Sequence, residues 1–514
     1  AKNGVKTLIL EKHTVPGGYC TNFKRKGYRF DASLHMINSC GVGQSAYKLL
    51  AKTGVTISYF ELGDELTPIE PDEVRFIKLP EISRLINLET NLDYITPGNI
   101  EDLETTLTEK FPHQADNLRS FLKDVKKMLK FFMDFQRAGT LGKIKVCLTR
   151  IPTLWKAFGS FKGTAKDLLD KHGITDPDLI QILTELCSFF ALPPEKLSQT
   201  IYIAGAFGYY IDGAFYVIGG SGALASAVAE TFKKFGGTLK LKALVEELLI
   251  DEETNRVKGV KLADGTNYSS KFFVANADAT HTFNELLNVS EEYLNENKKV
   301  SKFIQKINTR KSSLSAVICF MGLNLDLKKR GIEGYETFIS EKSISWEEQM
   351  RLIKNAEFEK IPGIPLTVYS NIDPTCCPEG KSVVSSIYLA DIEPFLELLD
   401  PNGERGERYF EFKQKIANHV IQKAGEMLKI PDLEKYVEVV EVATPITLHR
   451  YTNNRNGAFI GWQVIPEQQI LNQIPQKTPI KNLYIASAWT MPGGGVSAVM
   501  MSGEAVAKKL LKKL

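Results

Sequence analysis

Three glycine clusters are the first candidates for a binding site. They are Gly17-Gly18 after Pro16, Gly219-Gly220 before a predicted helix, and Gly493-Gly494-Gly495 before a predicted helix at 496–514. Glycine has no Cβ, so its backbone can press against a ligand. At 493–495, the following helix directs its unpaired N–H groups and the positive end of its dipole at the same place, which suits an anion or a planar ring with an electron-rich edge. A turn that only caps the helix is the alternative.

A carboxylate follows the first predicted strand, residues 5–10. In a dinucleotide-binding βαβ unit, an acidic residue at the end of the second strand accepts hydrogen bonds from the ribose hydroxyls. Glu11 is the candidate for this contact. The pattern places the first strand of the unit, with its glycine-rich phosphate turn, ahead of Ala1 and outside this sequence.

The elements that position these clusters alternate between helix and strand. A helix at 223–235 follows the second glycine cluster, and a strand at 238–241 follows Gly236-Gly237. A hairpin at 246–262 begins after Val245, and a buried strand at 272–278 carries Asn276. Residues 62–100 are predicted to contain strands of a different, antiparallel sheet. Residues 314–323 and 382–389 are predicted as central strands with apolar sides.

The stretch 119–171 is strongly basic. It has 13 Lys and Arg residues against 4 Asp, a net charge of +9, whereas the whole chain carries +3. Apolar residues such as Phe121, Val125 and Leu129 recur at spacings of three and four, which predicts an amphipathic helix. A basic amphipathic helix with Trp and Phe is typical of membrane-surface binding, and we predict it here. A core helix with a solvated basic face is the alternative.

Composition argues against several other kinds of protein. A net charge of +3 over 514 residues is unlike a nucleic-acid binder. No apolar run approaches the roughly 20 residues that span a bilayer. The seven cysteines form no C-x-x-C pair and the seven histidines no H-x-x-x-H spacing, so we expect a reduced, intracellular protein without a metal site.

Three segments together resemble a known family. Residues 11–35 read E-K-H-x-x-P-G-G-x-x-x-x-F-x-R-x-G-Y-x-F-D-x-S-L-H. This resembles the N-terminal signature of a flavoprotein family that contains phytoene desaturases, carotenoid (prolycopene) isomerases and retinol saturases. The glycine–helix–strand order at 219–262 resembles the middle of that family, and L-Y-I-A-S-A-W-T-M-P-G-G-G-V-S-A-V-M-M-S-G at 483–503 resembles its C-terminal signature.

The resemblance implies FAD as the cofactor. Tyr19 replaces the Arg of many relatives, and Arg25 is expected to compensate for it; Ala488 replaces the Asp that contacts the flavin ribityl chain. With the phosphate turn outside the sequence, we expect FAD binding to be impaired in the chain as given. The cofactor-binding residues that the resemblance implies are Glu11, Gly17, Gly18, Arg25, Gly219, Gly220, Val245, Asn276, Ser487, Gly493, Gly494, Gly495 and Val496.

The implied activity is that of an FAD-dependent oxidoreductase or isomerase acting on carbon–carbon double bonds of a long apolar polyene, a carotenoid or retinoid. His35, at the family's S-L-H position, is the candidate proton donor, with a core hydrogen-bonding role as the alternative. Trp489 and Met491 complete the catalytic candidates and are expected to shape the cavity. A flavin amine oxidase-like enzyme on a polar substrate, and a lipid-binding relative without flavin, stay open as alternatives.

The sequence therefore predicts an α/β fold. A Rossmann-like FAD-binding domain, its first strand and glycine-rich turn missing from this chain, would combine with an α+β substrate domain and a helical, membrane-associating insertion. We expect a cytoplasmic, peripherally membrane-associated protein that does not bind nucleic acid. The predicted bounds are 1–62, 215–300 and 441–514 for the FAD-binding domain, 63–101, 173–214 and 301–440 for the substrate domain, and 102–172 for the basic helical region.

Overall fold

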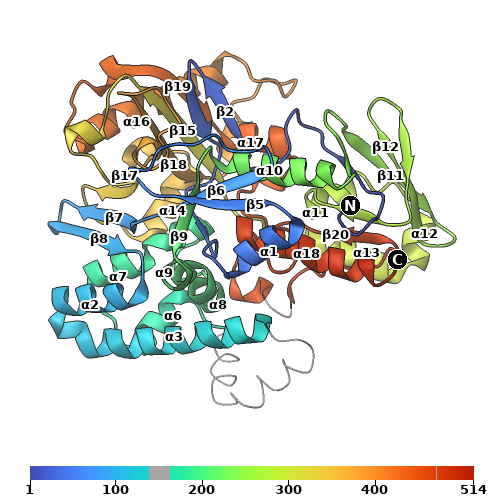
Figure 1. Cartoon of the computed structure of the whole chain (residues 1–514), viewed down its shortest axis with the longest axis horizontal. Coiled ribbons are helices and arrows are strands. Elements are labelled where there is room, and N and C mark those ends of the chain that lie inside the picture. Colours follow the sequence, from blue (N-terminus) through green and yellow to red (C-terminus); the bar gives the residue numbers. More distant parts are fainter. Residues whose placement is uncertain (138–161, 470–471) are drawn as a thin grey trace.

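The computed structural model describes residues 1–137, 162–469 and 472–514. Its largest sheet has seven strands and lies on the left of Figure 1. Neighbouring strands in it are antiparallel, except that β16 and β7 run parallel. In spatial order the strands are β19 (Val437–Ala443), β15 (Ser315–Leu323), β18 (Ser382–Ala390), β17 (Gly363–Val368), β16 (Glu336–Ser340), β7 (Glu81–Asn87) and β8 (Leu92–Pro97).

Strand β15 lies between the protein's two largest hydrophobic cores. All nine of its residues are buried. Val317, Cys319 and Met321 belong to a core shared with helices α14 (Trp346–Lys354) and α16 (Glu407–Met427). The alternate residues, Ile318 and Phe320, belong to the larger core on the other face. Successive side chains of a strand point to opposite faces, so a strand buried on both faces needs an unbroken run of apolar residues. The central strands predicted at 314–323 and 382–389 are confirmed.

Two of the parallel strand pairs form separate two-stranded sheets. β1 (Leu8–Leu10) pairs with β10 (Thr238–Lys240), and β14 (Phe273–Ala275) pairs with β20 (Leu483–Ile485). Leu10 and Phe273 pack against the same buried cluster. Within the described part of the chain, no strand pairs with the other edge of β1 or β14, and Ile9 and Val274 are 45% and 46% exposed.

Antiparallel strands complete the fold. The predicted hairpin after Val245 is confirmed as β11 (Val245–Asp251) and β12 (Arg256–Leu262), which β13 (Asn267–Ser269) extends. The prediction that residues 62–100 belong to one antiparallel sheet is wrong. β6 (Glu73–Lys78) lies in a four-stranded sheet in the order β4-β9-β6-β5 and pairs in parallel with β5, whereas β7 and β8 join the seven-stranded sheet.

The remaining elements connect and cover these sheets (Figure 1). The other strands are β2 (Asn22–Arg25), β3 (Tyr28–Asp31), β4 (Ile37–Asn38), β5 (Thr56–Phe60) and β9 (Ala214–Val217). The other helices are α1 (Ser45–Thr53), α2 (Ile100–Lys110), α3 (Ala115–Arg137), α6 (Ala165–Lys171), α7 (Pro177–Thr184), α8 (Gln199–Ile201), α9 (Phe207–Asp212), α10 (Ser221–Lys234), α11 (Ala279–Asn284), α12 (Glu291–Glu296), α13 (Lys298–Asn308), α15 (Glu393–Leu396), α17 (Pro445–Thr452) and α18 (Val496–Leu511).

Helix α3 carries the first part of the predicted membrane surface. Phe121, Leu122 and Val125 on its apolar face are fully buried in the larger core, so they do not contribute to a lipid-binding surface. Lys123 and Lys130 on the opposite face are exposed. The middle of the predicted surface, 138–161, lies outside the described residues.

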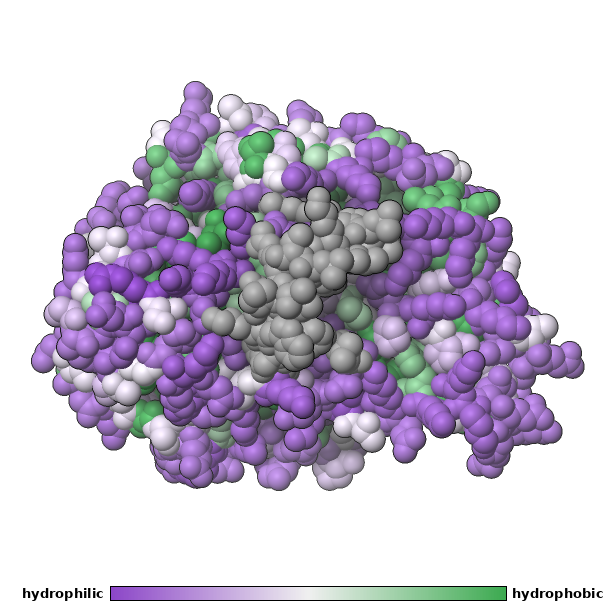
Figure 2. All heavy atoms as spheres, turned by 90° about the horizontal axis from the view of Figure 1, so that it is seen from below, coloured by the Kyte–Doolittle hydropathy of each residue, from purple (hydrophilic) through white to green (hydrophobic). Residues whose placement is uncertain are grey.

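Seen from below, the described surface is mostly hydrophilic, with apolar residues in small separate patches (Figure 2). No helix among the described residues is long and apolar enough to cross a bilayer. Membrane binding by 119–171 therefore stays a prediction.

The buried carboxylate of Asp31 anchors the start of α10. It accepts hydrogen bonds from the backbone N–H and the hydroxyl of Ser221 at 2.5 and 2.8 Å. It also accepts from the backbone N–H of Leu34 at 3.0 Å and the hydroxyl of Tyr216 at 3.2 Å. A carboxylate at a helix N-terminus satisfies donors that the helix itself cannot, so Asp31 fixes α10 against the turn that follows β3.

We expect Asp31→Ala to lower the free energy of unfolding by about 2–4 kcal/mol, because several buried donors lose their acceptor at once. Ser221→Ala removes only one hydroxyl donor and should cost about 1 kcal/mol. Urea unfolding followed by circular dichroism measures both. Equal small losses in the two variants would show that Asp31 does not anchor α10.

Candidate functional site

The carboxyl ends of the parallel strands carry several of the predicted cofactor residues. Glu11 follows β1, Asn276 follows β14, and Ser487 lies two residues beyond β20. The Asn276 side-chain amide donates a hydrogen bond to the carbonyl of Ala486, which joins the ends of β14 and β20. Ligands of open parallel sheets bind at this edge. The structure therefore brings these three residues to the edge where a dinucleotide is expected.

The predicted adenosine end of the site is also assembled. The Glu11 carboxylate accepts the backbone N–H of His13 at 2.8 Å, and the Glu11 carbonyl accepts the N–H of Ala243 at 2.8 Å. The second bond holds the segment that leads into Val245 beside the end of β1. This hydrogen bond to Ala243 therefore brings Val245 near Glu11, although the two residues are far apart in the sequence.

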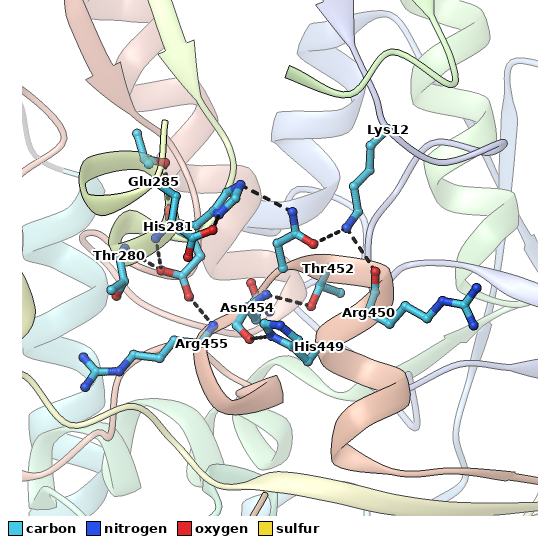
Figure 3. A network of polar contacts seen from close by, with 12 residues as sticks. Lys12, Thr280, His281, Glu285, His449, Arg450, Thr452, Asn454 and Arg455 are labelled. Atoms are coloured by element: carbon cyan, nitrogen blue, oxygen red, sulfur yellow. Dashed lines mark hydrogen bonds and ion pairs between the residues drawn. The ribbon is translucent and has the colours of Figure 1, made fainter. Parts of the chain in front are cut away.

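An open polar cleft of about 430 Å³ lies next to this edge. Lys12 lies at its boundary: its Nζ donates to Asn453 Oδ1 at 2.5 Å and to the carbonyl of Arg450 at 3.1 Å (Figure 3). Burial lowers the pKa of Lys12, and the neighbouring Glu11 charge partly offsets this. The cleft is lined by Thr280, His281, Asn284, Glu285, Asn308, His449, Asn453, Arg455 and Asn456.

Asp278 fixes the two sides of this cleft to each other. It caps α11 by accepting the N–H of Thr280 at 2.5 Å, and its second oxygen accepts the N–H of Arg455 at 2.6 Å (Figure 3). Burial raises the pKa of Asp278, while the hydrogen bond from Arg455 lowers it. Arg455 in this cleft and Lys12 at its boundary carry positive charge that can bind an anion, whereas His281 pairs with Glu285 of the same cleft at 2.8 Å.

The triple-glycine turn has one open and one packed side. Gly493 and Gly495 have φ of +124° and +98°, and a Cβ on either would meet nothing within 4 Å. A Cβ on Gly494 would lie 2.2 Å from the carbonyl oxygen of Ile460. Gly495 is the N-cap of α18 and no side chain caps that helix. This turn has no side chains, is open on one face and lies at the start of a helix that no side chain caps. Such a place fits a planar ring with an electron-rich edge.

The other glycine clusters are engaged in packing. A Cβ on Gly17 would lie 2.7 Å from Ala225 of α10, whereas Gly18 is open. Gly219 donates its N–H to Asp373 at 2.9 Å. Gly220 is the N-cap of α10, and the first N–H of that helix, on Ser221, donates to Asp31. These contacts bring the clusters together around α10, but the start of that helix is already satisfied by protein. The cofactor role of Gly219 and Gly220 therefore stays a prediction.

His35 forms a buried polar cluster with two residues of the seven-stranded sheet. Its Nδ1 lies 2.8 Å from Glu336 Oε2 on β16 and 3.0 Å from the hydroxyl of Thr367 on β17. The side chains of His35 and Glu336 are 10% and 1% exposed. Burial lowers the pKa of His35, but the charge and hydrogen bond of Glu336 raise it more, so its pKa lies above the ordinary value.

A second buried carboxyl group lies in the same region. Glu185, in a 3₁₀ turn (Glu185–Phe190), accepts from the hydroxyls of Ser83 at 2.6 Å and Thr96 at 3.0 Å. Burial raises its pKa to about 7, and the charge of Glu336 adds to this in spite of the two hydrogen bonds. The region thus contains an imidazole whose pKa is raised by a carboxylate and a carboxyl group whose pKa burial raises to about 7.

The other predicted site residues are not gathered with His35. Trp489 is buried against Trp462, with ring centroids 4.6 Å apart, in a different core, and Met491 is 46% exposed. The Arg25 guanidinium pairs with Glu441 of β19 at 3.0 Å and does not join the glycine turns. These surroundings lend no support to catalysis by Trp489 or Met491, or to phosphate binding by Arg25.

Sequence reasoning missed the polar groups of the cleft and the partners of His35. Lys12 was in the signature, but its partner Asn453 is more than 400 residues away, and no motif links the two. Glu336 and Glu185 lie on separate elements that only the fold brings near His35. The one available signal was Glu336, an acidic residue at the start of an apolar strand.

A family model described as an NAD(P)-binding Rossmann-like domain matches residues 1–53. Prolycopene isomerase of Arabidopsis thaliana is 24% identical over 516 residues, which cover 97% of this chain and 77% of that protein. All-trans-retinol 13,14-reductase of Rattus norvegicus is 25% identical, covering 94% and 78%. The neurosporene-forming phytoene desaturase of Rhodobacter capsulatus is 25% identical, covering 99% and 90%.

The chain is a homologue of these three enzymes. Together with the Rossmann-like domain, this relationship indicates an enzyme with a flavin-type cofactor. Solved structures agree in fold. An oxidoreductase from Methanosarcina mazei superposes with a TM-score of 0.60 at 13% identity, covering 99% of this chain and 95% of that one. Putrescine oxidase bound to putrescine superposes with a TM-score of 0.59 at 10% identity, covering 99% and 94%.

We expect Glu185→Gln to change how stability depends on pH. A carboxyl whose folded pKa is raised binds more protons in the folded than in the unfolded state, so its contribution to stability falls as pH rises from about 4.5 to about 7. In Glu185→Gln this loss disappears, so relative to wild type the free energy of unfolding of the variant should gain on the order of 3 kcal/mol between pH 4.5 and pH 8. Thermal melts across this range measure it.

Glu379→Gln, an exposed change of the same type, is the matched control and should show no such gain. A pH profile of Glu185→Gln parallel to that of wild type would contradict a raised carboxyl pKa at this position.

Proposed function

We propose that the protein is an FAD-dependent oxidoreductase or isomerase that acts on carbon–carbon double bonds of a long apolar polyene, a carotenoid or retinoid. The observation that carries this is the homology over nearly the whole chain with enzymes named for carotenoid and retinoid reactions. The alternative of an amine oxidase rests on fold-level likeness at 10% identity and is the weaker candidate.

The residues present fit a flavin dinucleotide. Glu11 and Val245 would hold the adenosine end, and Asn276 and Ser487 lie at the carboxyl edge between the two ends. The open face of Gly493 and Gly495, with Gly494 and Val496, would receive the flavin ring at the start of α18. Gly17, Gly18, Gly219 and Gly220 complete the proposed contacts. Lys12 and Arg455 supply positive charge beside the edge where the pyrophosphate would lie.

The chemistry divides between cofactor and protein. When bound, the flavin supplies hydride exchange with a substrate carbon. The protein orients the substrate, excludes water and holds a proton. His35 is the group we propose for the proton, because it is buried, its Nδ1 is fixed by Glu336, and its Nε2 has no partner among the described residues. We further propose the predicted domain bounds and peripheral membrane attachment through 119–171.

The cavity beside the glycine turn measures only about 10 Å³, room for about one water molecule. It is lined by Trp462, Gln473, Ala488, Thr490, Gly493 and Gly494, among others. A polyene at this place would require these side chains to move. A flavin absorption spectrum that changes on addition of carotenoid would support such an opening.

We expect the double change Lys12→Ala, Arg455→Ala to weaken FAD binding by about ten-fold or more, because two charge-assisted contacts of the pyrophosphate are removed. Titration of the protein with FAD, followed by quenching of flavin fluorescence, measures the dissociation constant. Lys354→Ala, an exposed lysine on α14, is the control and should leave it unchanged.

Equal FAD affinity in the double variant and the control would overturn the proposed pyrophosphate position.

The reaction itself is tested by incubating FAD-loaded protein, oxidised and reduced, with a panel of carotenoids and retinol. Turnover of amines with no change in any polyene would contradict the proposed function.

A further inference from the structure

The turn that carries His35 is attached to the helix of the triple-glycine turn. Asn38, three residues beyond His35, accepts a hydrogen bond from the hydroxyl of Ser497 at 3.1 Å through its backbone carbonyl and at 3.2 Å through its side chain. Ser497 lies in the first turn of α18. His35 is therefore tied to the helix start where the flavin ring is proposed, although the two are more than 400 residues apart in sequence.

The position of His35 is determined on several sides. The hydroxyl of Tyr335 donates to the His35 carbonyl, and the hydroxyl of Tyr369 donates to the Leu34 carbonyl at 3.0 Å. The rings of Phe189 and Tyr369 contact the imidazole edge-to-face, with centroids 5.8 and 6.3 Å away. A ring so confined can present only one nitrogen away from Glu336, and that nitrogen is Nε2.

The hydrogen bond to Glu336 sets which nitrogen carries a proton. An ionised carboxylate accepts only, so Nδ1 must donate to it. Thr367 also donates to the same carboxylate oxygen, at 2.9 Å. In neutral His35, Nε2 then has a lone pair, and in protonated His35 it has an N–H. Nε2 is buried and has no partner among the described residues, which is unusual for a buried polar atom.

Charge balance favours the protonated form. The titratable groups that act on or contact His35 are Glu336 on β16, Asp31 at the end of β3, and Tyr335 and Tyr369. Glu185 interacts with Glu336. Burial raises the pKa of both tyrosines, so they are neutral. Glu336 forms no ion pair with Lys or Arg in the described part of the chain, so His35 is its counter-charge.

We propose that Glu336 is a positioning residue that keeps His35 protonated, with Nε2–H as the free donor, and that this proton is the one added to the substrate when a double bond is saturated. The proposal rests on the proposed function. In that step the N–H bond breaks, its electron pair stays on Nε2, and a C–H bond forms at one substrate carbon. The hydride on the neighbouring carbon comes from the reduced flavin-type cofactor, which is thereby oxidised.

The first test measures the protonation of His35 directly. Protein labelled with ¹³C at histidine Cε1 gives one resonance for each histidine, and His35→Gln identifies that of His35. We expect Glu336→Gln to lower the His35 pKa by at least about one unit, because the charge is lost while an acceptor remains. Glu336→Asp should restore part of the shift, and Thr367→Val, which keeps the charge, should change it less.

An unchanged His35 pKa in Glu336→Gln, with the other histidine resonances unmoved, would overturn the positioning role. This measurement needs neither substrate nor flavin, so it is separate from a failure of the proposed function.

The second test asks whether this proton is used. The pH at which polyene saturation by the reduced holoenzyme falls off should shift downward in Glu336→Gln by the same amount as the His35 pKa. A pH–rate profile that stays in place while the pKa moves would overturn the role of His35 as donor, and so would the absence of any saturation by the wild-type protein.

Discussion

The buried carboxylate of Asp31 is the interaction on which the arrangement of the site depends. It joins the N-terminus of α10 to the turn that carries His35, and it also receives the hydroxyl of Tyr216. Burial raises the pKa of Asp31, and its hydrogen bonds from Ser221 and Leu34 counteract this. These donors lower the cost of burying the Asp31 carboxyl group, and without that group the helix start and the turn would lose their common anchor.

From this anchor the site extends in two directions. Toward the parallel strands, the residues after β14 and β20 are joined by Asn276, and Lys12, after β1, lies at the boundary of the polar cleft. Toward the seven-stranded sheet, His35 is bonded to Glu336 in an apolar interior. In our proposal, the first region receives an anionic dinucleotide, and in the second His35 holds a proton away from water. A reaction that exchanges a hydride and a proton with an apolar substrate needs both.

The sequence predicted the parts of this site that depend on local pattern. Strand ends, glycine turns and the hairpin after Val245 are encoded by neighbouring residues, and the family signatures placed them in order. The pairing of β6 with β5 and β9, the contact of Lys12 with Asn453, and the approach of Glu336 to His35 depend on residues far apart in sequence, so periodicity could not reveal them. Trp489 illustrates the same limit: its place in the signature suggested a cavity wall, but its partner Trp462 makes it a core residue.

We propose that a flavin ring lies against the open face of the triple-glycine turn at the start of α18. An experimental structure of the FAD-loaded protein tests this placement most directly. The ring should contact Gly493 and Gly495, with the adenosine end beside Glu11. A flavin bound elsewhere, with side chains still packed against that turn, would contradict it.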